Sequence, residues 1–503
     1  MKLKIFGAAL AAMSLCAWGG DDSLKNYLAT RNLSLEEAVH IALLQSPEIL
    51  KAKQEIERTR GVVIEVRAQA LPHLTASGDY SQQDKRLLND FGGGSSSSSA
   101  ATSTNTATVS GTNQEVNAAV AEVLKAQQEQ NAQNSQNVFN VRDKTWQVTI
   151  EARQLLYAGG QVRAALRIAK FTQDSSYWSL RDVIDRVIAT TRTQFYDVLL
   201  NRALIRVQEE SVGLLQSQLK DQTSRFDAGT VPRFNVLQAE VALANQQPAL
   251  IRARNNYLIS ELTLARTLGL GASEKKPGAP PINPIGELNV EPRGLDIAAE
   301  LAAAHEQRPF LKVQRLQILT EVEDIKVQLA GYKPRIEANG GYIFRNSRAS
   351  DDLTQVVNGW FFGATGSWDI FDGLATYGRV KQARAKLESS KINYEDSVHQ
   401  VDLEVQQAIA NVKQAKQTIE SQQKTVEQAK EAVRLSQERL NAGAGTQLDV
   451  LNAQVQQTQA RSTELQARHD YNAAVAELDR VTAAASRYEE TFDDPLAHRA
   501  PRP

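Results

Sequence analysis

The sequence predicts a mainly α-helical protein with a small β part, built from one structural unit that occurs twice. Three observations carry this prediction: an internal repeat, four short segments with strand periodicity, and two long stretches without proline. Matching residues stand 214 positions apart in one part of the chain, as Trp146 and Trp360 do, and 262 apart in another, as Pro72 and Pro334 do. The difference of 48 positions predicts an insertion in the first copy, at 84–143. A repeat this regular indicates one supersecondary unit used twice.

The N-terminal residues have the pattern of an export signal, expected to occupy residues 1–19. Two lysines precede a short apolar run, and small residues follow it. The alternative is lipidation of Cys16, although Leu15 directly before it fits a lipoprotein cleavage site poorly. Cys16 is the only cysteine, so a mature chain without it holds no disulfide and no cysteine-based metal site. No later apolar stretch is long enough for a transmembrane helix, so insertion into a membrane would require strands.

Four segments alternate between apolar and polar residues, two in each copy, at about 73–83, 144–157, 334–345 and 359–372. Alternation over about ten residues with aromatic edges is typical of outer-membrane barrel strands. A half-buried hairpin of a soluble domain is the alternative for any one of them. The candidate membrane-interface aromatic residues are Trp146, Tyr157, Trp360, Phe361, Phe362, Trp368 and Phe371.

Long helices are expected after each pair of strands, at about 161–228 and 375–442. The first stretch contains no proline and one glycine. The second contains no proline, and after Gly378 it contains no glycine. At 1.5 Å per residue, each helix would be roughly 95 Å long. Apolar residues recur every seven positions, from Val198 to Phe226 and again 214 positions later, a spacing that favours left-handed supercoiling. Such narrow apolar stripes favour helices packed in a single wall over helices around a globular core.

Each long helix is expected to end in a glycine-containing turn and to be followed by a returning helix, at about 233–268 and 447–482. The predicted order is therefore a signal peptide at 1–19, a first repeat at 20–270, a proline-rich linker at 271–293, a second repeat at 294–485 and a disordered tail at 486–503. Pro248 interrupts the first returning helix, where it could serve as a hinge or make a bend without a role.

Four membrane strands cannot close a barrel, because about eight is the practical minimum and an open sheet edge is not tolerated in lipid. The chain must therefore pool its strands with other copies. Three copies give a shared barrel of twelve strands, wide enough for a water-filled lumen, whereas eight strands from a dimer would be plugged by side chains. The insertion at 84–143 is then expected to be an extracellular loop of low-complexity composition, with an inward fold that narrows the pore as the alternative.

Several motifs resemble the TolC family of outer-membrane efflux and secretion channels over roughly residues 32–485. They are Ala38-Val39 and Ala42 before Ser46-Pro47-Glu48-Ile49, Ala304 before Arg308-Pro309-Phe310-Leu311, Tyr157-Ala158-Gly159-Gly160 with its echo Phe371-Asp372-Gly373, and the turns Ala228-Gly229 and Ala442-Gly443. The resemblance implies a trimeric α/β channel-tunnel, with a shared 12-stranded β-barrel in the outer membrane and a helical tunnel through the periplasm. It also implies two partners, a periplasmic adaptor (membrane fusion) protein and an inner-membrane pump of RND, ABC or MFS type.

The same resemblance assigns roles to the two interhelical turns. They would form the periplasmic tip that docks the adaptor, with Asp227, Ala228, Gly229, Thr230, Asn441, Ala442, Gly443, Ala444 and Gly445 as candidates. Asp449, its first-repeat counterpart Asn235, and Asn452 are the candidates for the gate or for ion selectivity. Capping of the following helix is an equally weighted role for Asp449. Leu440 and Gly445 stand where the family pattern has a tyrosine and an arginine. A latch formed by those two side chains at the closed tip is therefore in doubt for this chain.

No constellation of residues indicates catalysis, a cofactor or a metal site. The six histidines are scattered, and no glycine-rich loop ends in a phosphate-binding lysine. The net charge of −1 gives no general attraction to nucleic acid. The prediction is therefore a non-enzymatic channel component that provides a passive exit duct. The alternatives are a periplasmic adaptor or structural coiled coil, which would lack the strand pairs, and a passive porin, which leaves the long helices without a purpose.

Overall fold

The computed structural model describes residues 32–82, 125, 144–270, 282–346 and 353–484. They divide into two compact units. The helical unit consists of the described residues before Ile64, those of 167–323 and those after Lys381; the sheet unit consists of the described residues of 64–166 and 324–381. The expected signal peptide and tail, residues 271–281 of the expected linker, and the expected insertion except for Lys125 lie outside the described residues.

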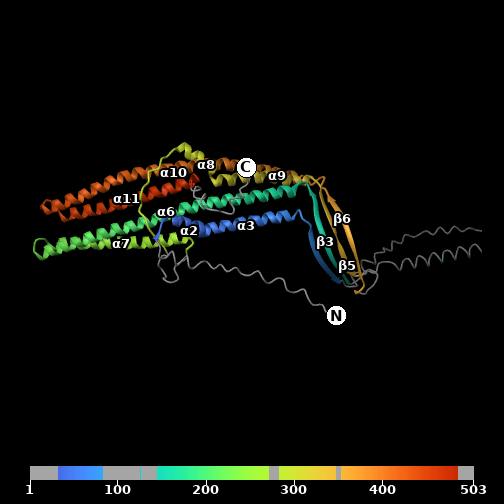
Figure 1. Ribbon diagram of the computed structural model, residues 1–503, viewed down its shortest axis with the longest axis horizontal. Coiled ribbons are helices and arrows are strands. Elements are labelled where there is room, and N and C mark those ends of the chain that lie inside the picture. Colours follow the sequence, from blue (N-terminus) through green and yellow to red (C-terminus); the bar gives the residue numbers. More distant parts are fainter. Residues whose placement is uncertain (1–31, 83–124, 126–143, 271–281, 347–352, 485–503) are drawn as a thin grey trace, which may run out of the picture. The chain divides into compact units, whose positions relative to one another are not determined.

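The elements repeat in the same order in the two halves of the sequence (Figure 1). The short helices α2 (Leu35–Gln45) and α3 (Pro47–Ala68) correspond to α8 (Ile297–Gln307) and α9 (Pro309–Leu329). The strands β2 (His73–Gln82) and β3 (Lys144–Ala158) correspond to β5 (Arg335–Asn346) and β6 (Val356–Ser367). The long helix α6 (Gln161–Asp227) and the returning helix α7 (Arg233–Thr267) correspond to α10 (Ala375–Asn441) and α11 (Gln447–Val481). Both long helices have 67 residues and both returning helices have 35, so the duplication is preserved almost residue for residue. The mainly helical fold with a small β part is confirmed.

The short helices begin at local stop and start signals in the sequence. Ser34 caps α2 through a capping box with Glu37, and Asp296 caps α8 by accepting from the backbone N–H groups of Ala298 and Ala299. Pro47 and Pro309 are the first residues of α3 and α9, a position where proline costs no helix hydrogen bond. Proline therefore separates each pair of helices at the same place in both copies.

The sheet unit contains one antiparallel sheet with the strand order β2-β3-β5-β6. β2 and β6 are its edge strands. Gly159, just after β3, has a φ of +63°, and a Cβ there would lie 2.9 Å from the backbone oxygen of Ala330. The Lys333 ammonium also donates to the Gly159 carbonyl at 3.2 Å. This close approach explains the glycine after the first strand pair.

The expected bounds of the fourth strand, 359–372, are wrong. β6 begins at Val356 because this residue pairs with Asn346 at the end of β5, and it ends at Ser367 opposite Arg335. Trp368 and Phe371 therefore follow the strand instead of lying in it. Beyond β6 the chain turns into α10, where an oxygen of Asp372 accepts from the backbone N–H of Thr376 at 2.7 Å and Gly373 has a φ of +67°.

The described residues of the helical unit form two large apolar clusters, one for each copy of the repeat, and a small one of Val39 and Ile188. The first surrounds Phe195 and Val198 of α6, and the second surrounds Val405 of α10 and Tyr471 of α11. A two-residue strand, β1 (Asn32–Leu33), pairs in parallel with β4 (Asn283–Pro284), and Arg202 of α6 donates to the Pro284 carbonyl at 2.8 Å. Residues 282–288 of the expected linker thus pack against the first repeat, whereas Asn289, Glu291 and Arg293 contact α11.

Partly buried ion pairs connect the helices of the second copy with α6 and with one another. Asp479 of α11 contacts Arg192 of α6 at 2.8 Å and also Arg293, which precedes α8. Arg308, at the α8–α9 junction, is 5% exposed and pairs with Glu404 of α10. Burial raises the pKa of Glu404, but its hydrogen bond and charge interaction with Arg308 outweigh burial and leave that pKa below its usual value.

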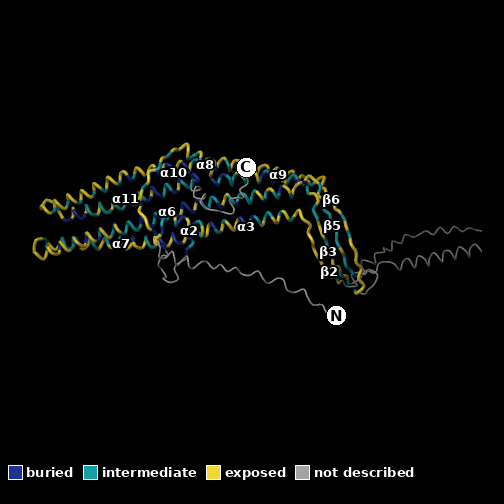
Figure 2. The backbone as a smooth tube through the Cα atoms, in the orientation of Figure 1, coloured by how far each residue is buried: buried dark blue, intermediate teal, exposed yellow. Residues whose placement is uncertain are grey.

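Burial along the long helices follows the expected seven-residue spacing and fades toward the turns (Figure 2). Val198, Val405 and Val412 are at most 1% exposed, whereas Phe226 at the end of α6 is 40% exposed. Within the described ranges, no helix combines the length and apolarity needed to cross a bilayer. Pro248 lies inside α7, which continues through it.

Candidate functional site

The two interhelical turns lie at the same end of the helical unit, where α6 passes into α7 and α10 into α11 (Figure 1). Gly229 and Gly443 each have a φ of +70°, a conformation that glycine adopts without strain. The backbone N–H of Thr230 donates to the Arg225 carbonyl at 2.9 Å, and that of Ala444 donates to the Arg439 carbonyl at 2.8 Å. These bonds span five residues and satisfy carbonyls that the ending helix leaves free.

The second turn is fixed by further hydrogen bonds. The Thr446 side chain accepts from the backbone N–H of Asp449 at 3.3 Å, and the Asp449 carboxylate accepts from the backbone N–H of Thr446 at 2.9 Å and from its hydroxyl at 2.8 Å. This is a complete capping box at the start of α11. The hydrogen bonds from the backbone and the hydroxyl of Thr446, with a smaller contribution from the charge of Arg439, hold the pKa of Asp449 below its usual value.

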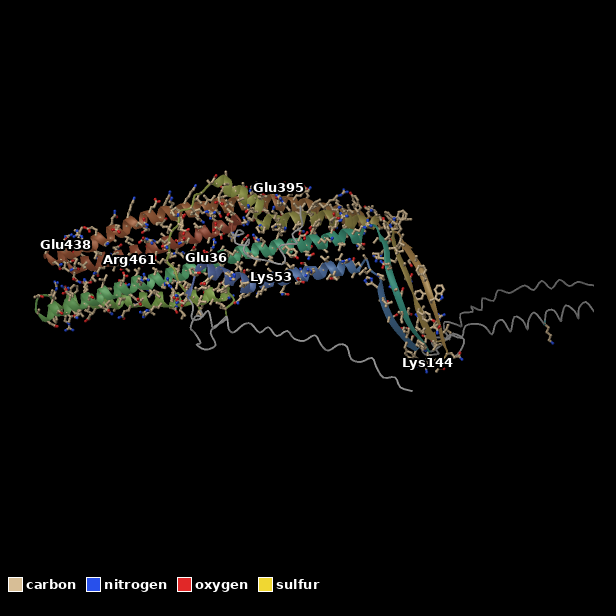
Figure 3. All side chains as sticks on the ribbon, viewed as in Figure 1. Glu36, Lys53, Lys144, Glu395, Glu438 and Arg461 are labelled. Carbon is tan, nitrogen blue, oxygen red and sulfur yellow. The ribbon has the colours of Figure 1, made fainter. Side chains whose placement is uncertain are left out.

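Gly445 is needed at its position because the chain doubles back there. A Cβ on Gly445 would lie 3.1 Å from the Cβ of Arg439 and 3.2 Å from the backbone nitrogen of Leu440. Arg439 itself donates to the Ala444 carbonyl at 3.3 Å. An arginine at position 445, as in the family pattern, would have to displace these neighbours. Nearby on α10, Arg434 forms ion pairs with Glu431 and with Glu438, which Figure 3 labels.

The first turn has no equivalent of this capping box. The N-cap of α7 is Pro232, which makes no side-chain capping bond. Asn235, at the position equivalent to Asp449, is half-buried, and its backbone N–H donates to the Pro232 carbonyl at 3.0 Å. Phe234 beside it is 68% exposed. The two turns of one chain therefore differ: the second has a capping box, and the first has no side-chain cap.

The structure places the other predicted tip residues on the surface of these turns. Residues that are exposed are Asp227, Ala228, Gly229, Thr230, Asn441, Ala442, Gly443, Ala444 and Asn452, while Gly445 is half-buried. Asn452 lies one helical turn after Asp449 on α11. Only short turns, 228–232 and 442–446, separate the arms of the two hairpins.

The predicted aromatic residues lie in the sheet unit, and several are strongly exposed in the single chain. The exposed fractions are 80% for Trp360, 76% for Phe362, 80% for Phe371 and 59% for Trp368; Tyr157 is also exposed, and Trp146 and Phe361 are half-buried. The indole N–H of Trp146 donates to the Leu353 carbonyl at 3.0 Å, and that of Trp368 donates to the Tyr332 carbonyl at 3.1 Å. Large apolar side chains left in contact with solvent indicate a surface that is covered in the assembled protein.

Sequence reasoning missed a set of polar contacts between α6 and α11, the first helix of one hairpin and the second helix of the other. The Gln222 amide donates to the Gln447 side-chain oxygen at 3.3 Å, and both residues are almost fully buried. Farther from the turns, Arg461 pairs with Glu210. Seven-residue spacing shows which helix face is apolar but not which helix covers it, so the sequence alone held no signal for these pairs.

No catalytic or metal-binding constellation emerges from the described part of the chain. Among these residues, no group of three or more His, Cys, Asp or Glu side chains could hold a metal ion. The candidate functional features of the described residues are the two turns, the exposed sheet and the contacts between helices.

Comparisons with known proteins agree with this geometry. The outer membrane protein TolC of Escherichia coli is 28% identical over 114 residues, and the alkaline protease secretion protein AprF of Pseudomonas aeruginosa is 27% identical over 120 residues. The matched segments span only 23% and 25% of these relatives and 23% and 24% of this chain. The Campylobacter jejuni outer membrane channel CmeC has a similar fold, with a TM-score of 0.68 at 15% identity over 92% of this chain and 90% of that one.

The profile of the outer membrane efflux protein family matches residues 129–270 and 301–484, which is most of the chain. The resemblance found in the paired helix motifs and the paired turns is thereby confirmed, and the chain belongs to the outer membrane efflux protein family.

Proposed function

We propose that three copies of this chain form an outer-membrane channel with a periplasmic helical tunnel, which serves as the passive exit duct of an efflux or secretion system. The observation that carries the proposal is the four-stranded sheet. Its edge strands β2 and β6 have no further partner among the described residues, and its aromatic side chains are exposed. Unpaired edges and lipid-facing aromatic residues are stable in a membrane only if the sheet closes with others.

The number of strands supports three copies. Joining β6 of one chain to β2 of the next would give twelve strands, all antiparallel if the pairing continues that of the single chain. A barrel of this size leaves room for an aqueous lumen, whereas eight strands are filled by their own side chains. Both sheet edges are then satisfied, and the exposed Trp360 and Phe362 meet lipid.

The helical unit supports the same closure through a difference in burial between the two copies. Leu451 of α11 is 6% exposed, but Leu237, its equivalent on α7, is 47% exposed. Ile251 of α7 is 67% exposed, while its equivalent Leu465 is partly buried against an apolar cluster. Because the two helices have equivalent positions in the repeat, we infer that α7 is covered by α10 of the next chain as α11 is covered within its own.

The polar turns are proposed as the periplasmic end of the channel. One Asp449 carboxylate per chain gives three around the axis of a trimer, where they would attract cations. Capping of α11 and attraction of cations are compatible, since the capping box favours the ionised carboxylate that an acidic ring needs. Asn235 and Asn452 would add neutral polar groups, and the exposed residues of both turns would contact the adaptor.

The proposed partners are a periplasmic adaptor protein and an inner-membrane pump. No nucleotide-binding motif is present in the sequence, so the energy for transport would come from the pump. The relatives include a protein named for the secretion of a protease, and the similar folds include outer-membrane channels. The pump class, RND, ABC or MFS, and with it the cargo, would be set by the system in which this chain works.

The test is the mass and location of the complex in mild detergent, corrected for bound detergent. Three chains per particle, recovered from the outer-membrane fraction, are expected. A water-soluble monomer, or a protein confined to the inner membrane, would refute the shared barrel. Charge reversal at the turns should abolish transport while leaving the trimer intact, whereas loss of the trimer would assign these turns a structural role only.

A further inference from the structure

The internal repeat preserves the register of the sheet. In the first copy, Tyr80 of β2 lies opposite Trp146 of β3. In the second copy, Tyr342 of β5 lies opposite Trp360 of β6. These residues are equivalent in the repeat, at spacings of 262 and 214 positions. The β2–β3 and β5–β6 hairpins therefore have the same register, and a contact that one copy makes predicts the position of its equivalent in the other copy.

The equivalence continues into the residues that follow β6. The Gln154 side chain of β3 donates to the Ala70 carbonyl at 2.9 Å. The indole N–H of Trp368, just after β6, donates to the Tyr332 carbonyl at 3.1 Å. Trp368 is the equivalent of Gln154, and Tyr332 is the equivalent of Ala70. The segment after β6 therefore lies where the end of β3 lies in the first copy, although it is not part of a strand.

The two equivalent strands differ in length. β3 continues to Ala158, directly before Gly159, whereas β6 ends at Ser367, five residues before Asp372, the equivalent of Ala158. The last residues of β3 pair with β5 alone, because β2 begins opposite Arg153. In the part of the chain that the structure describes, β6 has no second neighbour. It therefore ends where β5 ends.

The glycine after each strand shows where a neighbour is missing. Gly159 and Gly373 have nearly the same backbone conformation, with φ of +63° and +67°. Gly159 lies against the turn at 330–333, where a Cβ on it would be 2.9 Å from the Ala330 oxygen and 2.9 Å from the Cβ of Lys333. A Cβ on Gly373 would meet no described atom within 4 Å. The position beside Gly373 is thus open in the single chain.

The repeat identifies the turn that fits this open position. Residues 68–71, just before β2, are the equivalent of residues 330–333. The Lys333 N–H donates to the Ala330 carbonyl at 3.0 Å, and in the same way the Leu71 N–H donates to the Ala68 carbonyl at 2.9 Å. The two turns therefore close with the same backbone hydrogen bond, and residues 68–71 of a second copy have the conformation that the site beside Gly373 requires.

Exposure of equivalent side chains points to the same contact. Tyr157 of β3 lies opposite Ile336 of β5, and these side chains are 43% and 37% exposed. Their equivalents are Phe371, after β6, and Leu74 of β2, which are 80% and 74% exposed. Both edges of the sheet are mostly exposed in Figure 2. An apolar pair that is made within the chain therefore has its two equivalents separated on opposite edges, where each would shield the other across a contact between copies.

We propose that residues 368–371 complete β6 as a strand when it pairs with β2 of the next chain, in the register that the repeat supplies. This inference rests on the proposed trimeric channel and specifies its contact between chains. Ser367 then lies opposite Ser77 of the next chain, as Arg153 lies opposite Asn339 within one chain. The kind of partner is a second copy of this chain, and the contact orders a segment that is irregular without it.

Other registers fit the sheet less well. A slip of one residue would join the apolar face of one chain's sheet, which carries Leu74, to the polar face of the next, which carries Glu151. A slip of two residues keeps the faces but moves the turn at 68–71 by about 7 Å along the strand, away from Gly373. The register of the repeat is the one that matches both the faces and the turn.

One position of the contact differs between the copies. A Cβ on Gly341 would clash with the Ile150 carbonyl oxygen and with the Phe361 ring, so β5 approaches β3 closely at this glycine. The equivalent of Gly341 is Asp79 of β2. We therefore expect β2 to lie less close to β6 of the neighbouring chain beside Asp79, with the pairs on either side of this position in the same register.

Paired cysteine substitutions measure the register. Ser77→Cys with Ser367→Cys places two thiols opposite each other across the contact between chains. Ser367→Cys with Thr75→Cys, or with Asp79→Cys, represents a slip of two residues in either direction. Opposite residues of antiparallel strands have Cα atoms about 4.5–5.5 Å apart. Residues displaced by two positions are about 7–8 Å apart, beyond the span of an unstrained disulfide.

Each variant is expressed as the full chain and oxidised in outer-membrane preparations. The Ser77/Ser367 pair is expected to give cross-linked dimers and trimers on denaturing electrophoresis, and the two slipped pairs are expected to stay monomeric. Ser77→Cys alone is the control for random collision; the one native cysteine, Cys16, lies in the expected signal peptide. Preferential cross-linking of a slipped pair would overturn the register, as would failure of all three pairs in a protein that is trimeric in mild detergent.

Hydrogen exchange in the native trimer tests the completed strand without a substitution. The backbone N–H groups of residues 368–371 should exchange about as slowly as those of residues 154–157, the equivalent part of β3, because both would lie in paired strands. Fast exchange at 368–371 in a trimer whose residues 154–157 exchange slowly would overturn the proposal. Absence of trimers in the native protein would instead refute the channel itself, so the two failures are distinguishable.

Discussion

Asp185 of α6 is a buried carboxylate whose ionisation should make the protein less stable above about pH 6. It is 2% exposed, and neither of its oxygens has a hydrogen-bond partner in the structure. Burial raises its pKa from 3.8 to about 6; the charges of Arg181 and Arg480 oppose this rise, and that of Asp182 adds to it. The folded protein therefore favours the protonated acid, in contrast to a salt-bridged aspartate, whose pKa is lowered.

The size of the effect follows from the pKa difference. One pKa unit corresponds to about 1.4 kcal/mol. A pKa of about 6 in the folded protein instead of 3.8 therefore lowers the free energy of unfolding by about 3 kcal/mol once the group is ionised. Below the unfolded pKa the group is protonated in both states and costs nothing. The cost grows as pH rises through the window from 3.8 to about 6 and is fully present above it, because the unfolded state ionises first.

Asp185→Asn should remove this cost, since the amide has nearly the same shape and no charge. The purified protein in detergent is unfolded by heating at a series of pH values, and loss of helix is followed by circular dichroism at one scan rate, because unfolding of such assemblies is often irreversible. The midpoint difference between variant and native protein should be small at pH 4 and grow to a plateau near pH 7, with the variant higher.

Asp182→Asn is the matched control, one helical turn away. Asp182 pairs with Arg186 at 2.7 Å near the surface, where an ion pair contributes about 0–1 kcal/mol. Its removal should give a much smaller pH-dependent change of the midpoint than Asp185→Asn does, because burial and not the charge of Asp182 is the main cause of the raised pKa of Asp185. A midpoint difference for Asp185→Asn that is the same at pH 4 and pH 7 would refute the reasoning, as would a less stable variant at pH 7.

Three further predictions concern the turns and the assembly. Thr446→Ala removes the N-cap of α11 and should cost about 1 kcal/mol, detected as faster proteolysis near the second turn, with ion selectivity unchanged. Asp449→Asn keeps an acceptor for the Thr446 N–H but removes the charge, so it should reduce the preference for cations in single-channel recordings; unchanged selectivity would count against the acidic ring. Leu237→Glu, which places a charge on the exposed stripe of α7, should reduce the trimer fraction on sizing, whereas trimers at the native level would show that this stripe is not an interface.

Much of the helical architecture could be predicted because its signals are local. The absence of proline and the scarcity of glycine predicted the length of α6 and α10, and the glycine-containing turns predicted where they end. The long helices therefore begin and end within one residue of the expected positions. The strands were harder. β6 begins earlier than its alternation indicates because its register is fixed by pairing with β5, a non-local contact that no single segment encodes.

The features of the candidate site also divide into local ones, which could be predicted from the sequence, and non-local ones, which could not. The capping role of Asp449 could be predicted from Thr446 three residues before it, because a capping box is a local pattern. The buried Gln222–Gln447 pair and the unpaired carboxylate of Asp185 could not, since glutamine and aspartate on a long helix normally face water. Their burial depends on which helix lies alongside, and the apolar stripe is compatible with several neighbours.

Duplication gives both hairpins the same helix lengths, and the sequence differences within that common backbone distinguish the two contacts. Gln447 and Leu451 of α11 are 5% and 6% exposed, whereas their equivalents on α7, Arg233 and Leu237, are exposed in the single chain. Equivalent positions of the repeat therefore lie in different surroundings within one chain. In the proposed ring of three chains, α7 would be covered by the next chain, so each half of the repeat could diverge in sequence while keeping the common backbone.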